Sequence, residues 1–145
     1  LTYGLRTINY KDRIDFIDYC LEHKAENAGL LIVDGIADLC ADVNNIEESN
    51  ACVQRLMEWS AKHKVHIMCV IHSNFGSDKP TGHLGSFLEK KAETQIQLEA
   101  NTVNKEWITV KCKRSRGYAF ETFSFKVNDI GLPEIVGDLY DPLQN

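Results

Sequence analysis

The sequence predicts an α/β fold, in which a parallel sheet is flanked by helices and additional antiparallel strands follow on the C-terminal side. Two short apolar runs without alternation, Leu30–Val33 and Val65–Ile71, are typical of strands that are buried on both faces of a sheet. An amphipathic segment lies between them. Because a strand, a helix and a second strand in this order form a right-handed crossover, we expect the two strands to be parallel.

The first helix is predicted over Tyr10–His23. Apolar residues recur there at helical spacing with charged residues between them, so that one face turns toward the core. Its inward side chains are Ile14, Ile17, Cys20 and Leu21.

The connecting helix is predicted over Ile46–His63, after a polar connector that is rich in aspartate and asparagine. Glutamates fall in its first turn and lysines gather at its end, which matches the helix dipole. Its inward side chains are Val53, Leu56, Met57 and Trp59.

The C-terminal half begins with a long loop over Asn74–Leu84 and a short helix over Leu84–Lys91. Three segments with alternating apolar residues come next, and such alternation is typical of an exposed antiparallel edge. These strands are predicted at Thr94–Leu98, Glu106–Lys111 and Phe120–Val127. We expect the tail after Gly131 to be irregular.

Length and charge favour a single cytoplasmic domain over residues 1–145. A chain of 145 residues is long enough to bury one hydrophobic core. Its net charge of −5 gives no general attraction to nucleic acid or to a membrane, so an anionic partner would need a local basic patch. No apolar run approaches the roughly 20 residues that span a bilayer, and no secretory signal is visible.

The five cysteines predict reduced thiols, which fits a cytoplasmic protein. They are widely spaced and form no Cys-x-x-Cys pair, so a zinc site is not expected. Cys20 and Cys69 fall at apolar positions, and we expect them to pack in the core. The remaining three are Cys40, Cys52 and Cys112.

An acid and an imidazole follow the two predicted parallel strands. Asp34 ends the first apolar run and His72 follows the second. The carboxyl ends of parallel strands meet at one edge of a sheet, where α/β proteins bind ligands. A carboxylate there can hold a hydrated Mg²⁺, while a neighbouring polar group contacts a phosphate. The alternative is an ordinary Asp-Gly turn beside a histidine that caps its strand.

Positive charge gathers in two places on this acidic chain. The long loop carries Lys79 and His83 among glycines, which suits contact with a phosphate backbone, although a plain surface loop has the same composition. The stretch Lys111–Arg116 holds four cations in six residues. The planar fork of arginine suits phosphate oxygens. The alternative for this stretch is a solvated hairpin.

Four segments in a fixed order carry a resemblance to a known family. They are Leu30–Leu39, Ile67–Asn74, Thr81–Leu88 and Lys113–Gly117. In this order and spacing they resemble the second half of a RecA-like P-loop ATPase, closest to the hexameric-helicase and RepA-like branch associated with plasmids and mobile elements. The resemblance covers residues 29–127 and implies a RecA-like core fragment.

The resemblance implies roles for the residues at the sheet edge and on the loop. Asp34 would be the Walker B acid, which orients Mg²⁺ through water. His72 would occupy the sensor position and report the γ-phosphate of ATP to the loop beyond it. Lys79 and His83 would lie on the loop that approaches DNA in this family.

The resemblance also implies a homo-oligomer, because the basic stretch corresponds to the Lys/Arg finger of the family. Arg114 or Arg116, together with Lys113, would act on the nucleotide of a neighbouring subunit and stabilise the transferring phosphate. Which of the two arginines aligns with the finger stays open.

One part of the family pattern is missing from this sequence. No Gly-x-x-x-x-Gly-Lys-[Ser/Thr] motif is present, although that loop holds the phosphates of ATP. Since the chain begins at Leu1 rather than at methionine, we expect a C-terminal portion of a longer Mg²⁺- and ATP-dependent, DNA-associated ATPase. Such an enzyme would act as a helicase or in replication, mobilisation or recombination of DNA. Alone, the chain is expected neither to bind ATP tightly nor to hydrolyse it.

Two other functions stay open from the sequence. A RecA-like module without a phosphate-binding loop would instead be a non-catalytic protein that binds DNA or a partner ATPase. A flavodoxin-like or hydrolase domain would use Asp34 and His72 directly, but the sequence lacks a nucleophile at a strand-to-helix elbow.

Overall fold

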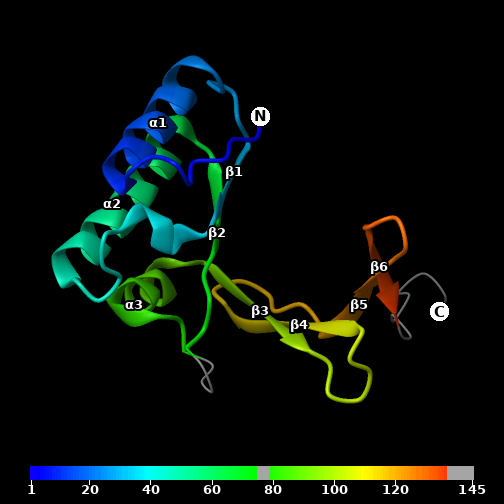
Figure 1. The fold of residues 1–145 in the computed structure, drawn as a ribbon. Helices are drawn as coiled ribbons and strands as arrows, with labels where there is room; N and C mark the ends of the chain where they lie inside the picture. The colour runs from blue at the N-terminus through cyan, green and yellow to red at the C-terminus, as the bar shows by residue number, and fades with distance from the viewer. Residues whose placement is uncertain (75–78, 137–145) are drawn as a thin grey trace. The chain divides into compact units, whose positions relative to one another are not determined.

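The computed structural model describes residues 1–74 and 79–136, and the chain divides into two compact units (Figure 1). In its described residues the first unit, Leu1–Lys91, contains helices and a parallel sheet of two strands. The second unit, Ala92–Asn145, contains a separate antiparallel sheet of four strands. The fold is therefore mixed α/β, as the sequence predicts, but the antiparallel strands form a sheet of their own and do not extend the parallel one. A single domain over the whole chain stays a prediction.

Helices α1 (Tyr10–His23) and α2 (Ile46–His63) begin and end where the sequence predicts. Each is preceded by an asparagine, Asn9 or Asn45, whose side chain accepts a hydrogen bond from the backbone N–H three residues later, at 3.0 and 3.1 Å. These caps satisfy amides that have no partner inside the helix. In residues 1–74 and 79–136, none of the helices has both the length and the apolar character required to cross a bilayer.

The core of the first unit lies between the helices and one face of the sheet. Its most completely buried large side chains are Trp59, Ile36, Leu84 and Val65, each at most 2% exposed. The prediction that Met57 turns inward is wrong, because its side chain is 44% exposed. Position 57 lies at the margin of the buried stripe of α2, where a flexible methionine reaches solvent.

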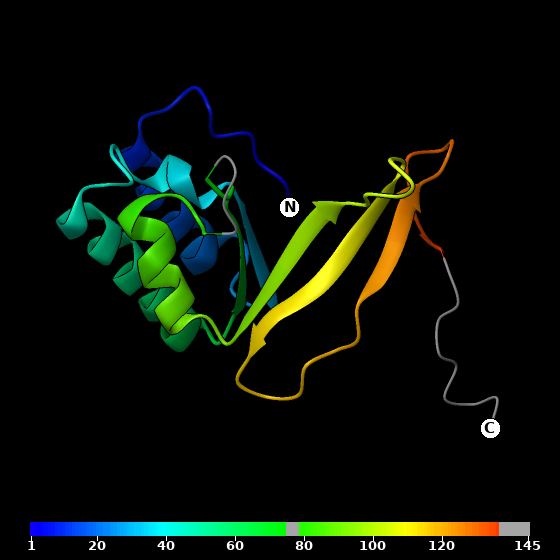
Figure 2. The same cartoon turned by 90° about the horizontal axis from the view of Figure 1, so that it is seen from below.

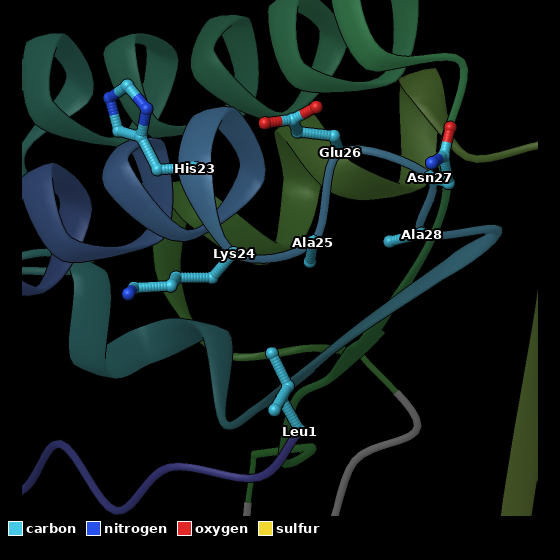
Figure 3. A pocket seen from close by; sticks show the side chains of 7 residues that line it. All are labelled: Leu1, His23, Lys24, Ala25, Glu26, Asn27 and Ala28. Carbon is cyan, nitrogen blue, oxygen red and sulfur yellow. The ribbon is translucent and has the colours of Figure 1, made fainter.

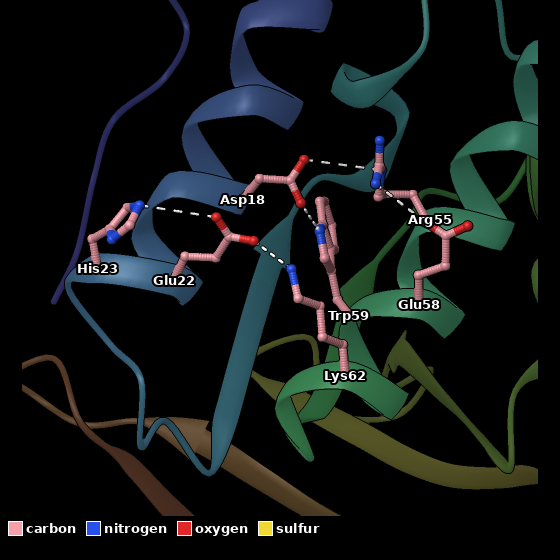
Figure 4. Close-up of polar contacts among 7 residues, drawn as sticks. All are labelled: Asp18, Glu22, His23, Arg55, Glu58, Trp59 and Lys62. Atoms are coloured by element: carbon pink, nitrogen blue, oxygen red, sulfur yellow. Dashed lines mark hydrogen bonds and ion pairs between the residues drawn. The ribbon is translucent and has the colours of Figure 1, made fainter.

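Polar contacts fix α1 against α2 beside this core (Figure 4). The indole Nε1 of Trp59 donates a hydrogen bond to Asp18 at 2.5 Å, and Arg55 lies 4.0 Å from the same carboxylate. One turn further along α1, Glu22 pairs with Lys62. The hydrogen bond and charge of Lys62 hold the pKa of the Glu22 carboxyl below its ordinary value. The buried indole is therefore satisfied, whereas the exposed Glu22–Lys62 pair contributes little to stability.

Strands β1 (Leu30–Asp34) and β2 (His66–Val70) confirm the predicted parallel pair. The register runs from Leu30 opposite His66 to Asp34 opposite Val70. The helical crossover through α2 connects them, so the two strands end at the same edge of the sheet.

The prediction that these strands are buried on both faces is wrong. Exposure alternates along both strands, and only the inward face packs against the core. A run composed wholly of apolar residues does not distinguish a strand covered on two faces from one covered on a single face, because the outward positions are apolar as well. The exposed apolar side chains of the outward face are Leu30, Ile32, Met68 and Val70.

The antiparallel sheet of the second unit has the order β3-β4-β5-β6 (Figure 2). Its strands are β3 (Thr94–Ala100), β4 (Trp107–Ser115), β5 (Phe123–Val127) and β6 (Pro133–Val136). Strand β6 forms in the tail that was predicted to be irregular. Gly131 turns the chain there with a φ of +82°, and Pro133 begins an edge strand, where its missing N–H is tolerated.

The two faces of the antiparallel sheet differ in polarity. The register places Leu98 opposite Val110 and Ile108 opposite Phe125, so apolar side chains of neighbouring strands share one face. Charged side chains pair on the other face. These ion pairs are Lys111 with Glu99 and Lys126 with Glu134. The alternation of the sequence thus corresponds to one apolar and one polar face.

Candidate active site at the edge of the parallel sheet

Asp34 and His72 lie at the same edge of the parallel sheet. Asp34 is the last residue of β1 and pairs with Val70, the last residue of β2, and His72 follows two residues later. With neighbouring strands about 4.8 Å apart and a rise of about 3.3 Å per residue, the two Cα atoms are separated by roughly 8 Å. The predicted juxtaposition is present, whereas the catalytic roles of both residues stay predictions.

Asp34 lies on the outward face of the sheet, and both Asp34 and His72 are exposed. Successive residues of a strand point to opposite faces, so Asp34 and Val70 both lie on the outward face. Beyond the end of β2, Ile71 is half-buried and His72 is exposed. Asp34 is exposed as well. A carboxylate and an imidazole are therefore both open to a ligand beside Val70.

A groove of about 640 Å³ runs along β1 and reaches Asp34. Its polar part also includes Arg6, Arg13 and Asp38, and its apolar part comes from the N-terminal segment, α1 and β1. Among the described residues, neither His72 nor any residue of β2 lines this groove. A separate depression of about 520 Å³ at the end of α1 contains neither site residue (Figure 3).

The chain after Asp34 is held by a short helix and by α2. The 3-10 helix η1 (Ile36–Leu39) begins directly after Gly35. In the connector that follows, the N–H groups of Ala41 and Asp42 donate to the carboxylate of Glu48 at 3.0 and 3.1 Å. Because Glu48 lies in the first turn of α2, the helix itself positions the connector.

The chain after His72 folds back onto the end of its own strand. The carbonyl oxygen of His72 accepts hydrogen bonds from the N–H of Thr81 at 3.2 Å and from its hydroxyl at 2.9 Å. The N–H of Asn74 donates to the carbonyl of Lys79 at 2.9 Å and closes the base of the predicted loop. Residues 75–78 of that loop lie outside the described residues. The backbone of His72 is therefore hydrogen-bonded directly to the segment that leads into the next helix.

One backbone carbonyl joins the two segments that leave the sheet edge. The carbonyl oxygen of Val43, in the connector after Asp34, accepts the N–H of Leu84 at 3.1 Å and the hydroxyl of Ser49 at 3.0 Å. Ser49 is fully buried, so its hydroxyl requires this acceptor. Sequence analysis did not find this connection, because a backbone carbonyl has no signature in the sequence.

Helix α3 (Gly82–Lys91) begins two residues before its predicted start at Leu84. His83 therefore lies in the first turn of a helix and not in a loop. The side chains of His83 and Lys79 are both exposed, and their predicted contact with DNA stays a prediction.

Glycine is required at two positions of α3. The backbone of Gly82 has a φ of +68°, and a Cβ there would lie 2.6 Å from the carbonyl oxygen of Val43. A Cβ on Gly85 would lie 2.5 Å from the Cβ of Pro80 and 2.7 Å from its carbonyl carbon. These contacts are too short for any side chain, so the glycines allow α3 to approach both segments.

The basic stretch of the second unit is largely strand. Lys113 and Arg114 belong to β4, which extends past its predicted end to Ser115, and Arg116 follows it. All three cations are exposed. Relative to β3, β4 contains one extra residue here, which forms a β-bulge next to Arg114. Within the described part of the first unit, the strand register brings Asp34 and His72 to the same edge of the sheet.

Comparison with known proteins adds no assignment to this geometry. No family model matches the chain, and no curated protein shows significant similarity to it. The residues and their arrangement are therefore the basis of the proposals that follow.

Replacing Gly85 with alanine should destabilise the first unit. The added methyl group meets Pro80 in a packed environment, and overpacking of this kind typically costs about 1–3 kcal/mol. Gly29→Ala is the matched control, because a Cβ at Gly29 meets no atom within 4 Å. Urea denaturation measures both free energies of unfolding. Equal stability of Gly85→Ala and the wild type would contradict the close approach of α3 to Pro80.

Proposed function

We propose that this chain is the C-terminal portion of a RecA-like, Mg²⁺- and ATP-dependent, DNA-associated ATPase. It would act in the cytoplasm as a helicase or in replication, mobilisation or recombination of DNA. The complete enzyme would be a homo-oligomer, and the phosphate-binding loop would come from residues outside this sequence.

The observation that carries this proposal is the position of Asp34 and His72. An exposed carboxylate at the end of one strand and an exposed imidazole just beyond its parallel neighbour lie at one edge of the sheet. This edge is the ligand-binding edge of open α/β sheets. A phosphate group that bridges the two side chains fits the roughly 8 Å that separates their Cα atoms.

The residues present fit a Mg²⁺ ion held through water. Mg²⁺ keeps several waters and is commonly bound by one or two carboxylates together with substrate phosphates. Asp34 offers one exposed carboxylate at the sheet edge, and within residues 1–74 and 79–136 no group of three acidic, histidine or cysteine side chains forms a closed metal cage. When bound, Mg²⁺ would neutralise charge on the phosphates of ATP.

The contacts around His72 support a role in transmitting the state of the nucleotide. Its side chain would contact the γ-phosphate, and its carbonyl is bonded to Thr81, which leads into α3. A movement of His72 would therefore displace the segment that carries Lys79 and His83, the proposed DNA contacts. Coupling of this kind needs a continuous set of contacts, and the hydrogen bonds of Thr81 supply it.

The exposed cations at the end of β4 would act on a neighbouring subunit. Arg114 or Arg116 would stabilise the charge on the transferring phosphate, and Lys113 would contribute to nucleotide binding there. A second function, a non-catalytic module that binds DNA or a partner ATPase, is favoured by one observation. The sequence has the basic strand end but no phosphate-binding motif.

Replacing Asp34 with asparagine should abolish most turnover of the complete enzyme. Loss of the charge that holds Mg²⁺ removes several kcal/mol of transition-state stabilisation, so kcat should fall by about 100-fold or more. Asp38→Asn is the matched control, because Asp38 lines the same groove and the charge change is identical. Release of inorganic phosphate is measured with and without DNA. Wild-type turnover in Asp34→Asn would contradict the role of Asp34 as the acid that holds Mg²⁺.

Replacing Arg114 and Arg116 together with alanine should lower kcat by about 1,000-fold while the affinity for ATP changes little. Lys105→Ala, an exposed cation outside the basic stretch, should leave both unchanged. Mixing the double variant with Asp34→Asn subunits tests whether the arginines act on the nucleotide of a neighbouring subunit. Mixed oligomers contain some interfaces with an intact Asp34 and intact arginines, so part of the activity should return. Full activity of the double variant by itself would eliminate the finger role.

A further inference from the structure

Three of the five cysteines meet in the core of the first unit. Cys40 and Cys52 are buried, with 9% and 4% of their surfaces exposed, and Cys69 packs against the same cluster. They come from the connector after η1, from α2 and from β2. Cys69 packs against the core as predicted, whereas Cys20 is half-buried and is not among the residues of the core cluster. The two buried cysteines are Cys40 and Cys52.

The backbone of α2 places the thiols of Cys40 and Cys52 beside each other. The Sγ of Cys40 donates to the backbone carbonyl of Glu48 at 4.0 Å. In an α-helix that carbonyl accepts the N–H of the residue four positions later, which is Cys52. Residues four apart also lie on the same helix face, so Cys52 projects from the side of α2 on which Cys40 rests.

The two thiols differ in acidity. The hydrogen bond with Cys52 lowers the pKa of the Cys40 thiol, whereas the contact with Cys40 and burial raise the pKa of the Cys52 thiol. Burial raises the pKa of Cys69 to about 11. Cys40 is also the more exposed thiol of the pair, so we assign the attack on a hydroperoxide to its thiolate.

We propose that Cys40 and Cys52 form a reversible intramolecular disulfide when the chain meets a hydroperoxide. The Cys40 thiolate attacks hydrogen peroxide, which gives a sulfenic acid and hydroxide. The Cys52 thiol then attacks the sulfenic sulfur, and water leaves as the disulfide forms. In sum, two thiols lose two hydrogen atoms and two electrons, and one peroxide becomes two waters.

The bond would fix the connector after Asp34 to α2. Cys40 is the residue that follows η1, and the carbonyl of Val43, three residues later, holds the start of α3. The disulfide would therefore close the connector between η1 and α2 into a covalent loop and restrict the segment next to the sheet edge. This modification is independent of the proposed ATPase activity, because it needs only the packing of the first unit.

Thiol mapping of the 145-residue chain tests the proposal. The folded chain is treated with hydrogen peroxide, the remaining thiols are alkylated with N-ethylmaleimide, and a tryptic digest is examined by mass spectrometry without reduction. Residues 25–55 form one tryptic peptide that contains Cys40, Cys52 and no other cysteine. After peroxide treatment this peptide should carry no alkyl group and should weigh two hydrogen atoms less than the reduced peptide. Reduction with dithiothreitol followed by fresh N-ethylmaleimide should give the doubly alkylated form.

Variants separate the pair from the other cysteines. Cys52→Ser should remove the disulfide and leave Cys40 as a sulfenic acid that dimedone traps, whereas Cys112→Ser should leave the disulfide intact. In the wild type, Cys20, Cys69 and Cys112 should stay alkylated. Full alkylation of residues 25–55 after peroxide treatment, or a disulfide that involves another cysteine, would overturn the proposal whatever the outcome of the ATPase assays.

Discussion

The parallel pairing of β1 with β2 is the constraint on which the rest of the first unit depends. Its register brings Asp34 opposite Val70, so the two strands end together and the polar residues after them meet at one edge. The crossover through α2 enforces this direction, and α2 also supplies much of the core below the sheet. Without parallel pairing, Asp34 and His72 would lie at opposite ends of the sheet.

The segments that leave this edge are connected by backbone hydrogen bonds. Thr81 binds the carbonyl of His72, and Leu84 binds the carbonyl of Val43. Gly82 and Gly85 allow this approach because no Cβ fits at either position. These hydrogen bonds connect the backbone of His72, the start of α3 and the connector after Asp34.

The boundaries of α1 and α2 were predictable from the sequence because local signals determine them. The apolar stripes and the asparagine caps of α1 and α2 lie within a few residues of the boundaries that they fix. The meeting of Asp34 and His72 was predictable as well, because a strand-helix-strand crossover has one handedness and one strand direction. Which face of β1 is covered was not predictable, because every position of the run Leu30–Val33 is apolar.

Features that depend on tertiary contacts had no signal in the sequence. Val43 connects α3 to the connector through its backbone carbonyl, and every residue type has that group. The contact between Cys40 and Cys52 arises because the connector folds onto the first turns of α2. Cys40 lies outside the helix, so no helical spacing in the sequence relates it to Cys52. Strand β6 was missed because its pairing with β5 comes from a turn at Gly131 and not from its own alternation.

A double-mutant cycle between Asp34 and His72 in the proposed complete ATPase tests most directly whether the two residues serve one site. Phosphate release is measured for Asp34→Asn, His72→Ala and the double variant. If both side chains act on the same bound nucleotide, their effects are coupled, and the double variant should be no slower than Asp34→Asn within about twofold. Fully multiplicative losses in kcat, or a His72→Ala variant with wild-type turnover, would contradict a shared site at this edge of the sheet.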